Sequence, residues 1–150
     1  MSEAREAAGP LPVVPFIKTP ADGDVYLEGS VCKHCDTTFL GLRVACAKCG
    51  ARDEMVVRRL SSRGTLHTFT IVHRSFPGVA VPYVSAVVDL EGGGSIKGNL
   101  INVPPDPQQI AFGMPVDVVF GDALGRKDAA GNSYVSYFFQ PSLKAQGSSR

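Results

Sequence analysis

The 150-residue sequence contains no tryptophan, few charged residues (19%) and no long hydrophobic run. A membrane-spanning helix needs about 20 consecutive apolar residues, and no segment approaches that length. The 15 basic and 14 acidic residues leave a net charge of +1, so the chain has no overall attraction to nucleic acid or to an acidic membrane surface. Helical periodicity is also scarce. These absences predict a soluble protein that is not dominated by helices and that binds no membrane.

The abundant residues predict a β-rich fold. Hydrophobic residues make up 44% of the chain, and 16 glycines and 11 prolines interrupt it. Frequent turn residues between short apolar runs are typical of sandwiches and barrels. A chain of this length buries about 68 to 70% of its unfolded surface, which is enough for a hydrophobic core that needs no metal.

The four cysteines form two Cys-x-x-Cys pairs, Cys32 with Cys35 and Cys46 with Cys49. Two intervening residues let one tight turn direct both thiolates at one ion, and the spacing between the pairs suffices for a short hairpin that brings the two turns together. Asp36 and Gly50 follow the pairs, and both tolerate the left-handed backbone that such turns need. Because four thiolates complete a tetrahedron, we expect a structural zinc site with no open catalytic position.

Three other roles for the cysteines stay open at this point. Rubredoxin-like iron also accepts four tetrahedral sulfur ligands, so the sequence does not separate it from zinc. Two disulfides need an oxidising compartment, whereas the first residues lack the apolar core of a signal peptide and predict a cytoplasmic protein. Thioredoxin-like redox chemistry normally accompanies a strand–helix context. His34 lies between two cysteines and is expected to be a solvated bystander.

Composition divides the chain into four segments. Residues 1–23 are rich in proline and form an extended arm that does not fold alone, although its apolar stretch 11–17 is available to dock on a partner. Residues 24–59 form a zinc ribbon with too little hydrophobic content to fold without the ion. Residues 60–141 form a second domain, and residues 142–150 form a disordered tail.

The second domain contains five β-branched runs separated by glycine and proline. These predicted strands are 64–74, 83–90, 95–102, 116–121 and 134–140. The run 83–90 alternates most cleanly between a core face and an outer face, and the glycines 92–94 turn it into the next strand. The run 64–74 breaks alternation, which predicts a bulge or a strand shared between two sides of a barrel.

A short helix is predicted between the third and fourth of these strands. Asp106 is suited to cap a helix, Pro107 to occupy its first position and Gly113 to end it. Five strands with one short helix at this position are the arrangement of an OB-fold. The predicted fold class is therefore mainly β, with an N-terminal rubredoxin-like zinc ribbon followed by a five-stranded OB-fold barrel.

Several motifs follow one another in a recognisable order between residues 26 and 141. They are the cysteine ribbon, GTLHTFTIVHR at 64–74, PYV at 82–84, GNL at 98–100 and GMPVDVVF at 113–120. In this order they closely resemble the acyl-CoA-associated family first catalogued as domain of unknown function 35 (DUF35). The resemblance implies a zinc ribbon joined to an OB-fold. It also implies a partner subunit or appended domain of an enzyme that acts on acyl-CoA thioesters, notably a thiolase-like enzyme or an aldolase of steroid side-chain and aromatic degradation.

The chain departs from the family pattern upstream of the first cysteine. Many members have a helical segment there with an aromatic-Trp-Glu-Gly motif, which often contacts the partner enzyme. This chain has VYLEG at 25–29, after a proline-rich arm, and no tryptophan. The departure leaves the identity of the partner open.

No catalytic constellation is apparent in the sequence. A thiolase needs nucleophilic and acid–base cysteines with supporting histidines, whereas all four cysteines here are assigned to the metal and the chain has three histidines. The chemistry of the complex is therefore expected to belong to another chain. Candidate contacts with that partner or with coenzyme A are Arg58, Arg59, Arg63, His73, Arg74, Phe76, Tyr83, Lys97 and Asn99.

Each group of candidates has a functional and a structural interpretation. The three arginines carry forked donors suited to the phosphates of coenzyme A, although such a run is more often a solvated face. The loop from His73 to Gly78 ends in a bulky apolar tip, and loops often carry contacts with partners. OB-folds usually bind ligands on strands two and three, which selects Tyr83, Ser85, Lys97 and Asn99; otherwise these residues are the polar side of a half-exposed sheet.

Three functions are consistent with these motifs and this composition. The leading one is a non-catalytic zinc-binding subunit of a heteromeric thiolase-like enzyme, with the acyl-CoA thioester as a shared ligand; the alternative within the same class is a subunit of a steroid-type aldolase or hydratase complex. A single-strand nucleic-acid binder is a rival because OB-folds and ribbons both serve that role, but the neutral charge and few aromatics argue against it. Rubredoxin-like electron transfer would require iron, and it gives the barrel no purpose.

Overall fold

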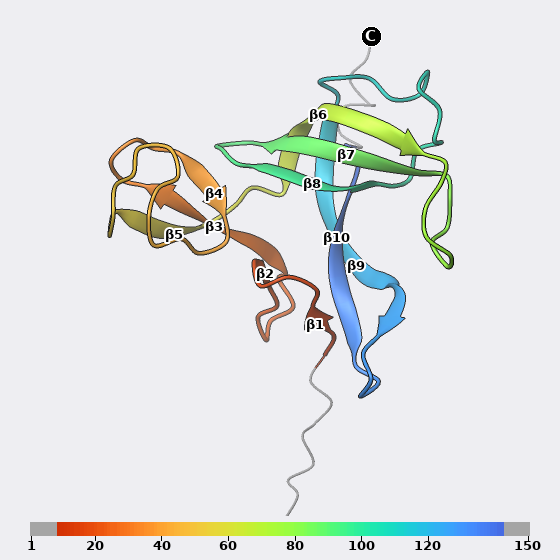
Figure 1. Cartoon of the computed structure of the whole chain (residues 1–150), viewed down its shortest axis with the longest axis horizontal. Coiled ribbons are helices and arrows are strands. Elements are labelled where there is room, and N and C mark those ends of the chain that lie inside the picture. Colours follow the sequence, from red (N-terminus) through yellow and green to blue (C-terminus); the bar gives the residue numbers. More distant parts are fainter. Residues whose placement is uncertain (1–8, 143–150) are drawn as a thin grey trace, which may run out of the picture.

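The computed structural model describes residues 9–142, and these form two β-sheets without any helix (Figure 1). The strands are β1 (Leu11–Pro12), β2 (Ile17–Lys18), β3 (Tyr26–Cys32), β4 (Thr38–Leu40), β5 (Met55–Arg59), β6 (Arg63–Val72), β7 (Tyr83–Leu90), β8 (Ser95–Leu100), β9 (Pro115–Lys127) and β10 (Ser133–Pro141). The mainly-β fold class is confirmed. Within this part of the chain, no helix is long and apolar enough to cross a membrane.

Strands β6 to β10 form a closed barrel. Antiparallel pairs join β6 to β7 and β7 to β8, a parallel pair joins β8 to β10, and antiparallel pairs join β10 to β9 and β9 back to β6. A closed five-stranded barrel fits the predicted OB-fold. Closure also removes the unpaired edges that an open sheet would expose.

Alternation along β7 builds one wall of the barrel core. Val84, Ala86, Val88 and Leu90 are buried, and the residues between them are half-buried, as the sequence predicted. Phe139 of β10 belongs to the same cluster and is the largest side chain that is fully buried. The barrel therefore has a continuous hydrophobic interior, to which Ile17 of β2 and Leu27 of β3 also contribute.

Strand β6 contains the predicted irregularity. Its register with β7 shifts between Leu66 and Thr68, so His67 is the extra residue of a bulge. The first residues of β6, Arg63 to Thr65, also pair with β9 on the other side. Both proposed explanations for the broken alternation are therefore confirmed: β6 carries a bulge and is shared between two sides of the barrel.

The predicted short helix between β8 and β9 is wrong. Asp106 starts a turn as expected, because its Oδ1 accepts a hydrogen bond from the backbone N of Gln108 at 2.9 Å. The turn is not continued, since Ile110 is drawn into the barrel core and the backbone N of Gly113 donates to the carbonyl of Leu66 at 2.7 Å. These contacts with the barrel outweigh a helical propensity that three prolines in 104–107 already weaken.

The segment before β3 lies along the chain's own strands. β1 pairs in parallel with β10, β2 pairs with β3, and Ile17 is 1% exposed. The apolar stretch 11–17 was expected to be available to a partner, but its central contacts are made within this chain. Beyond Ser142, the predicted disordered tail lies outside the described residues.

The smaller sheet is organised around β3, with which β2, β4 and β5 all pair antiparallel. Residues 26–59 are called the ribbon below, and β6 to β10 the barrel; Figure 1 shows them side by side. They meet at the turn between β7 and β8. Thr38 of β4 packs against Gly93, and the Arg58 guanidinium donates to the carbonyl of Gly92 at 2.8 Å.

Candidate metal centre and barrel groove

Two turns with the same hydrogen-bond pattern position the cysteines. In the first turn, the backbone N of Asp36 donates to the carbonyl of Cys32 at 2.8 Å. In the second, the backbone N of Gly50 donates to the carbonyl of Cys46 at 2.9 Å. Asp36 and Gly50 have φ values of 61° and 78°, so the left-handed positions predicted after each pair are confirmed.

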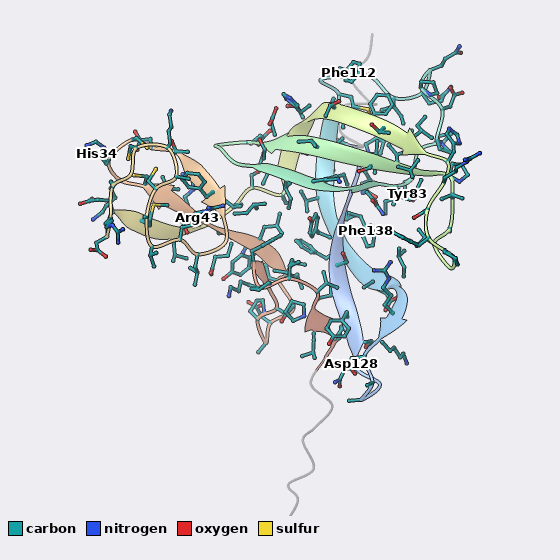
Figure 2. All side chains as sticks on the ribbon, in the orientation of Figure 1. His34, Arg43, Tyr83, Phe112, Asp128 and Phe138 are labelled. Carbon is teal, nitrogen blue, oxygen red and sulfur yellow. The ribbon has the colours of Figure 1, made fainter. Side chains whose placement is uncertain are left out.

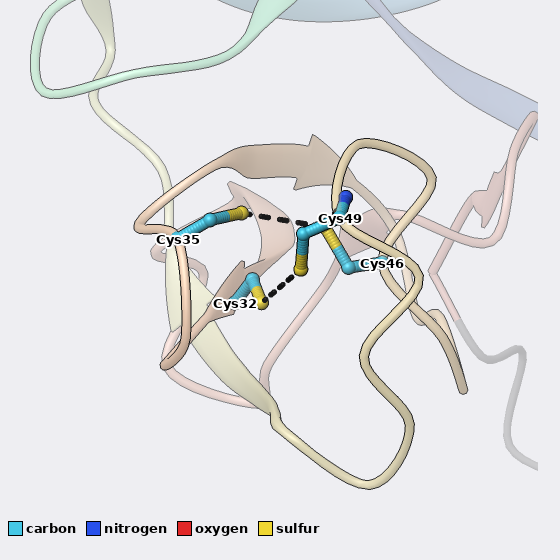
Figure 3. A group of neighbouring side chains, drawn as sticks. All are labelled: Cys32, Cys35, Cys46 and Cys49. Carbon is cyan, nitrogen blue, oxygen red and sulfur yellow. Dashed lines mark hydrogen bonds between the residues drawn. The ribbon is translucent and has the colours of Figure 1, made fainter.

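The four sulfur atoms converge between these turns (Figure 3). The Sγ atoms of Cys32 and Cys49 are 3.7 Å apart, those of Cys35 and Cys46 are 3.5 Å apart, and all four lie within 4.8 Å of one another. A tetrahedral zinc site with Zn–S bonds of about 2.3 Å requires S–S separations of about 3.8 Å. The donor set and its spacing therefore fit a metal such as zinc.

Neighbouring groups tune the thiols unequally. A hydrogen bond between the Thr37 hydroxyl and the sulfur of Cys35, 3.2 Å long, is the main reason that the pKa of Cys35 falls to about 6. At Cys49 the backbone N–H of Ala51 lowers the pKa, but burial and the three neighbouring thiols together raise it to about 12. Four thiols this close resist ionising together, and a cation between them relieves that repulsion.

Burial shows how much of the ribbon depends on this cluster. Between residues 28 and 59, Cys32 and Cys46 are the only buried hydrophobic side chains, whereas Leu42 and Val44 are 69% and 85% exposed. The sulfur cluster thus occupies the place of a hydrophobic core. His34 is exposed and does not belong to the cluster (Figure 2), as predicted.

The structure brings two of the three arginines together: Arg58 and Arg59 both line a hollow of about 460 Å³ between the ribbon and the barrel, and Arg63 does not line it. Arg58 binds the carbonyl of Gly92, as described above. Arg59 forms two hydrogen bonds with the Asp24 carboxylate, at 2.7 and 3.1 Å, and lies over the ring of Tyr26. Hydrogen bonding and charge from Arg59 lower the pKa of Asp24. Two of the three side chains thus have structural partners, and Arg63 is exposed on β6 without an ion pair among residues 9–142.

Three of the candidates on the barrel converge on one groove. Phe76, Tyr83 and Asn99 line a hollow of about 790 Å³ on the side of the barrel formed by β7 and β8. Figure 2 shows Tyr83 on this side together with Phe138 of β10, which also lines it. His73, Arg74 and Lys97 are exposed but are not among its lining residues.

Sequence reasoning missed the part of this groove that β9 supplies. Strand β9 continues to Lys127 instead of ending at residue 121, and it forms a hairpin with β10 beyond the barrel (Figure 1). Leu124 and Arg126 of this extension line the same groove as Phe76. The Asp-x-x-Gly pattern at 122–125 was the available signal, because Asp and Gly at this spacing are typical of a turn.

A second polar cluster lies at the β6 bulge. The Asp89 carboxylate accepts a hydrogen bond from the Ser95 hydroxyl at 2.6 Å, and its other oxygen lies 2.9 Å from Nδ1 of His67. The bonds to Ser95 and His67 lower the pKa of Asp89. Since the serine donates to the carboxylate and not to the imidazole, His67 does not activate Ser95 as a nucleophile.

Comparison with known proteins gives consistent matches. A model of the C-terminal OB-fold domain of ChsH2 matches residues 57–121. A DUF35 domain-containing scaffold protein of Methanocaldococcus jannaschii is 35% identical over 97 residues, which cover 63% of this chain and 67% of that protein. The benzoylsuccinyl-CoA thiolase subunit BbsA of Geobacter metallireducens is 36% identical over 77 residues, about half of each chain (50% and 51%).

A solved structure shares the fold. The structure described as an Ltp2-ChsH2(DUF35) aldolase superimposes with a TM-score of 0.60 and 24% identity, over 79% of this chain and 86% of that chain. At this identity the superposition supports the arrangement of strands and no more.

Proposed function

The chain belongs to the DUF35 family, and on this basis we propose that it is a non-catalytic, zinc-binding subunit of a heteromeric thiolase-like enzyme that acts on acyl-CoA thioesters. In this role residues 24–59 form the metal module and residues 60–141 the barrel. The barrel holds the complex together and helps to shape the site for the acyl-CoA, which the two subunits share.

The observation that carries the proposal is the similarity to a thiolase subunit. The relative from Geobacter metallireducens is named as one subunit of a benzoylsuccinyl-CoA thiolase, and this chain is 36% identical to it over 77 residues. A subunit of such an enzyme needs a surface for its partner. The groove on the barrel, with the exposed Phe76 at its edge, offers a surface of this kind.

Zinc has a structural role in this proposal. Cys32, Cys35, Cys46 and Cys49 would hold the ion, and the bound zinc would supply four bonds that cross-link the two turns of the ribbon. A site closed by four thiolates leaves no position for substrate. Since the ribbon buries few hydrophobic side chains besides its cysteines, this cross-link would be the main source of its stability.

The test is affinity purification of the tagged full-length chain from its own host. Co-eluting proteins are identified by mass spectrometry, and the eluate is assayed for zinc, iron and nucleic acid. A thiolase-like chain in stoichiometric amount together with one zinc per chain is the expected result. An aldolase or hydratase chain would assign the subunit to the alternative acyl-CoA complex, and nucleic acid without a protein partner would overturn the proposal in favour of an OB-fold nucleic-acid binder.

Binding of coenzyme A is tested on the purified components. Calorimetric titration of an acyl-CoA into the complex, the catalytic chain alone and this chain alone separates a shared site from a site on one subunit. A shared site predicts tighter binding by the complex than by either component. Equal affinity of the complex and the catalytic chain alone would remove this chain from the acyl-CoA site.

A further inference from the structure

Leu124 is placed where neither its backbone nor its side chain stabilises the isolated chain. Its φ of 58° lies in the left-handed region, which asparagine and glycine adopt far more readily than leucine. Its side chain is 69% exposed, so it contributes little to the hydrophobic core. An unfavourable backbone at an exposed apolar residue is a reason to look for a function.

The surrounding turn holds this leucine in position. The Asp122 carboxylate accepts a hydrogen bond from the backbone N of Gly125 at 2.6 Å, and Gly125 continues the left-handed conformation with a φ of 76°. The β9–β10 register is interrupted over the same stretch, between Ser133 and Val135 on the opposite strand. Residues 122–125 therefore form a defined bulge that lifts Leu124 away from the hairpin.

Leu124 and Phe76, which is 84% exposed, both line the 790 Å³ groove. Tyr83 and Leu100 contribute to the lining between them. Arg126 lines the same groove and has no ion-pair partner within residues 9–142. The groove thus combines two projecting apolar side chains with one available guanidinium.

We infer that this groove binds a segment of the catalytic partner that inserts an apolar side chain between Phe76 and Leu124 and places a carboxylate on Arg126. The inference rests on the proposed function, since it specifies how that partner docks. A guanidinium binds carboxylates, as it binds phosphates, through two parallel hydrogen bonds, and a carboxylate is the anionic group that an unmodified protein segment supplies.

A protein segment fits the groove better than a small ligand does. Small-molecule sites are concave and bury most of the ligand within their walls. Here the apolar side chains of Phe76 and Leu124 in the lining are 84% and 69% exposed, which is typical of residues that become buried when a protein partner covers them. Exposed apolar anchors beside an arginine are also the residue types that dominate binding energies at protein interfaces.

The decisive variant is Leu124→Asn, with Leu42→Asn as its matched control. Both leucines are 69% exposed, but Leu42 lies on the ribbon and not in the groove. Affinity for the purified thiolase-like chain, measured by biolayer interferometry, is expected to fall at least about tenfold with Leu124→Asn and to stay unchanged with Leu42→Asn. Because asparagine tolerates the left-handed backbone, the melting temperature of the isolated Leu124→Asn chain is expected to equal or exceed that of the wild type.

A second variant tests the carboxylate. Arg126→Gln is expected to weaken the complex at low salt and to reduce the dependence of its affinity on salt, since one ion pair is lost. Unchanged affinity of both Leu124→Asn and Arg126→Gln, with the wild-type complex intact, would overturn the inference about the groove and leave the proposed function standing. Failure of the wild-type chain to bind any acyl-CoA enzyme would overturn both.

A small-molecule role for the groove has its own measurement. The isolated chain is titrated with an acyl-CoA, and Leu124→Asn is titrated alongside it. No binding to the isolated chain is the expected result. Binding that Leu124→Asn abolishes would make the groove a ligand site and overturn its assignment to a partner segment.

Discussion

The ribbon and the barrel are both made of short antiparallel strands, but different forces hold them together. The barrel closes around side chains such as Val88, Leu66 and Phe139, each at most 1% exposed. The ribbon contributes one side chain to that core, Leu27 of β3, and its other buried hydrophobic side chains are the two cysteines Cys32 and Cys46. The barrel is therefore stabilised by its hydrophobic core, and the ribbon depends on whatever binds its four sulfurs.

This difference explains why exposed apolar side chains have different meanings in the ribbon and in the barrel. The ribbon does not depend on a hydrophobic core for its fold. It can therefore leave Leu42, Val44, Val56 and Val57 exposed to solvent. In the barrel most apolar residues are needed inside. The few that remain outside, such as Phe76 and Leu124, accordingly point to contacts with another molecule.

The largest expected effect comes from breaking the metal centre. Cys46→Ser should abolish zinc binding and unfold the ribbon while the barrel keeps its structure, because structural zinc contributes on the order of 10 to 16 kcal/mol of apparent binding free energy in small modules. Zinc content is measured by mass spectrometry, and the fate of each region is followed by amide NMR signals.

The control for this change is His34→Ala, which alters an exposed residue of the same turn and should retain zinc and ribbon signals. Loss of the barrel signals together with those of the ribbon in Cys46→Ser would show that the two regions fold as one unit. Full zinc retention by Cys46→Ser would refute the four-thiolate site.

The complementary change removes core volume from the barrel. Phe139→Ala replaces a fully buried ring and should lower the free energy of unfolding of the barrel by about 3 to 5 kcal/mol, through lost burial and the cavity left behind. Zinc content should not change in molecules that remain folded. Urea unfolding of the zinc-loaded protein measures the loss.

Phe112→Ala is the matched control, because Phe112 is 71% exposed and its ring packs on that of Phe69 with 5.3 Å between the centroids. Phe112→Ala should lower the free energy of unfolding by less than about 1.5 kcal/mol. Equal losses for the two phenylalanines would contradict the burial on which the comparison rests.

A smaller effect is expected where the two regions meet. At Gly93, a Cβ would lie 2.6 Å from Oγ1 of Thr38, and the φ of 123° is already unfavourable for other residues. Gly93→Ala should therefore lower the free energy of unfolding by about 2 kcal/mol and shift the NMR signals of Thr38 and its neighbours in β4. Chemical denaturation and chemical-shift mapping provide the two measurements.

The variant Gly131→Ala separates the effect of backbone strain from the effect of the steric clash with Thr38. Gly131 also has a positive φ, of 83°, but nothing lies within 4 Å of an added Cβ. Gly131→Ala should lower the free energy of unfolding by about 1 kcal/mol and leave the NMR signals of β4 unchanged. If Gly93→Ala and Gly131→Ala shift the NMR signals of β4 equally, the contact between Thr38 and Gly93 does not set the position of the ribbon.

The features that the sequence predicted correctly depend on local patterns. The cysteine spacing, with Asp36 and Gly50 after the pairs, predicted two equivalent turns because a turn is determined by few adjacent residues. Alternation in 83–90 predicted both ends of β7, since its two faces meet core and solvent in strict succession.

The features that were missed depend on contacts between distant segments. Asp106 carries a helix-start signal, yet the helix is prevented by two backbone hydrogen bonds with Leu66 of β6, which accepts from Gly113 and donates to Met114. Arg58 and Arg59 resemble a basic patch in the sequence, but their partners, Gly92 and Asp24, are more than thirty residues away in the chain. The groove itself combines Phe76 with Leu124, and no local pattern relates those positions.

The smallest predicted effect concerns the end of the β9–β10 hairpin, which has neither a core nor a metal. Asp128 accepts hydrogen bonds from the side chain and backbone of Asn132 and from the Tyr134 hydroxyl, and these bonds lower its pKa from 3.8 to about 2. Since the folded state prefers the carboxylate, this stabilisation is present above pH 3.8 and is lost as the pH falls towards 2. Asp128→Asn should therefore be less stable than the wild type at neutral pH, by a modest amount because the site faces solvent.

The pH dependence identifies the cause of that difference. As the pH is lowered from about 4 towards 2, the wild type should lose its advantage over Asp128→Asn, because the wild-type carboxylate becomes protonated and the asparagine does not titrate. Tyr134→Phe, which removes one donor and keeps the charge, should reduce the stability at neutral pH and shift the loss of stability to higher pH. Thermal melts at a series of pH values measure all three proteins. A gap between wild type and Asp128→Asn that stays constant over this range would mean that the carboxylate does not hold the hairpin end through its charge, and that this third region relies on backbone pairing alone.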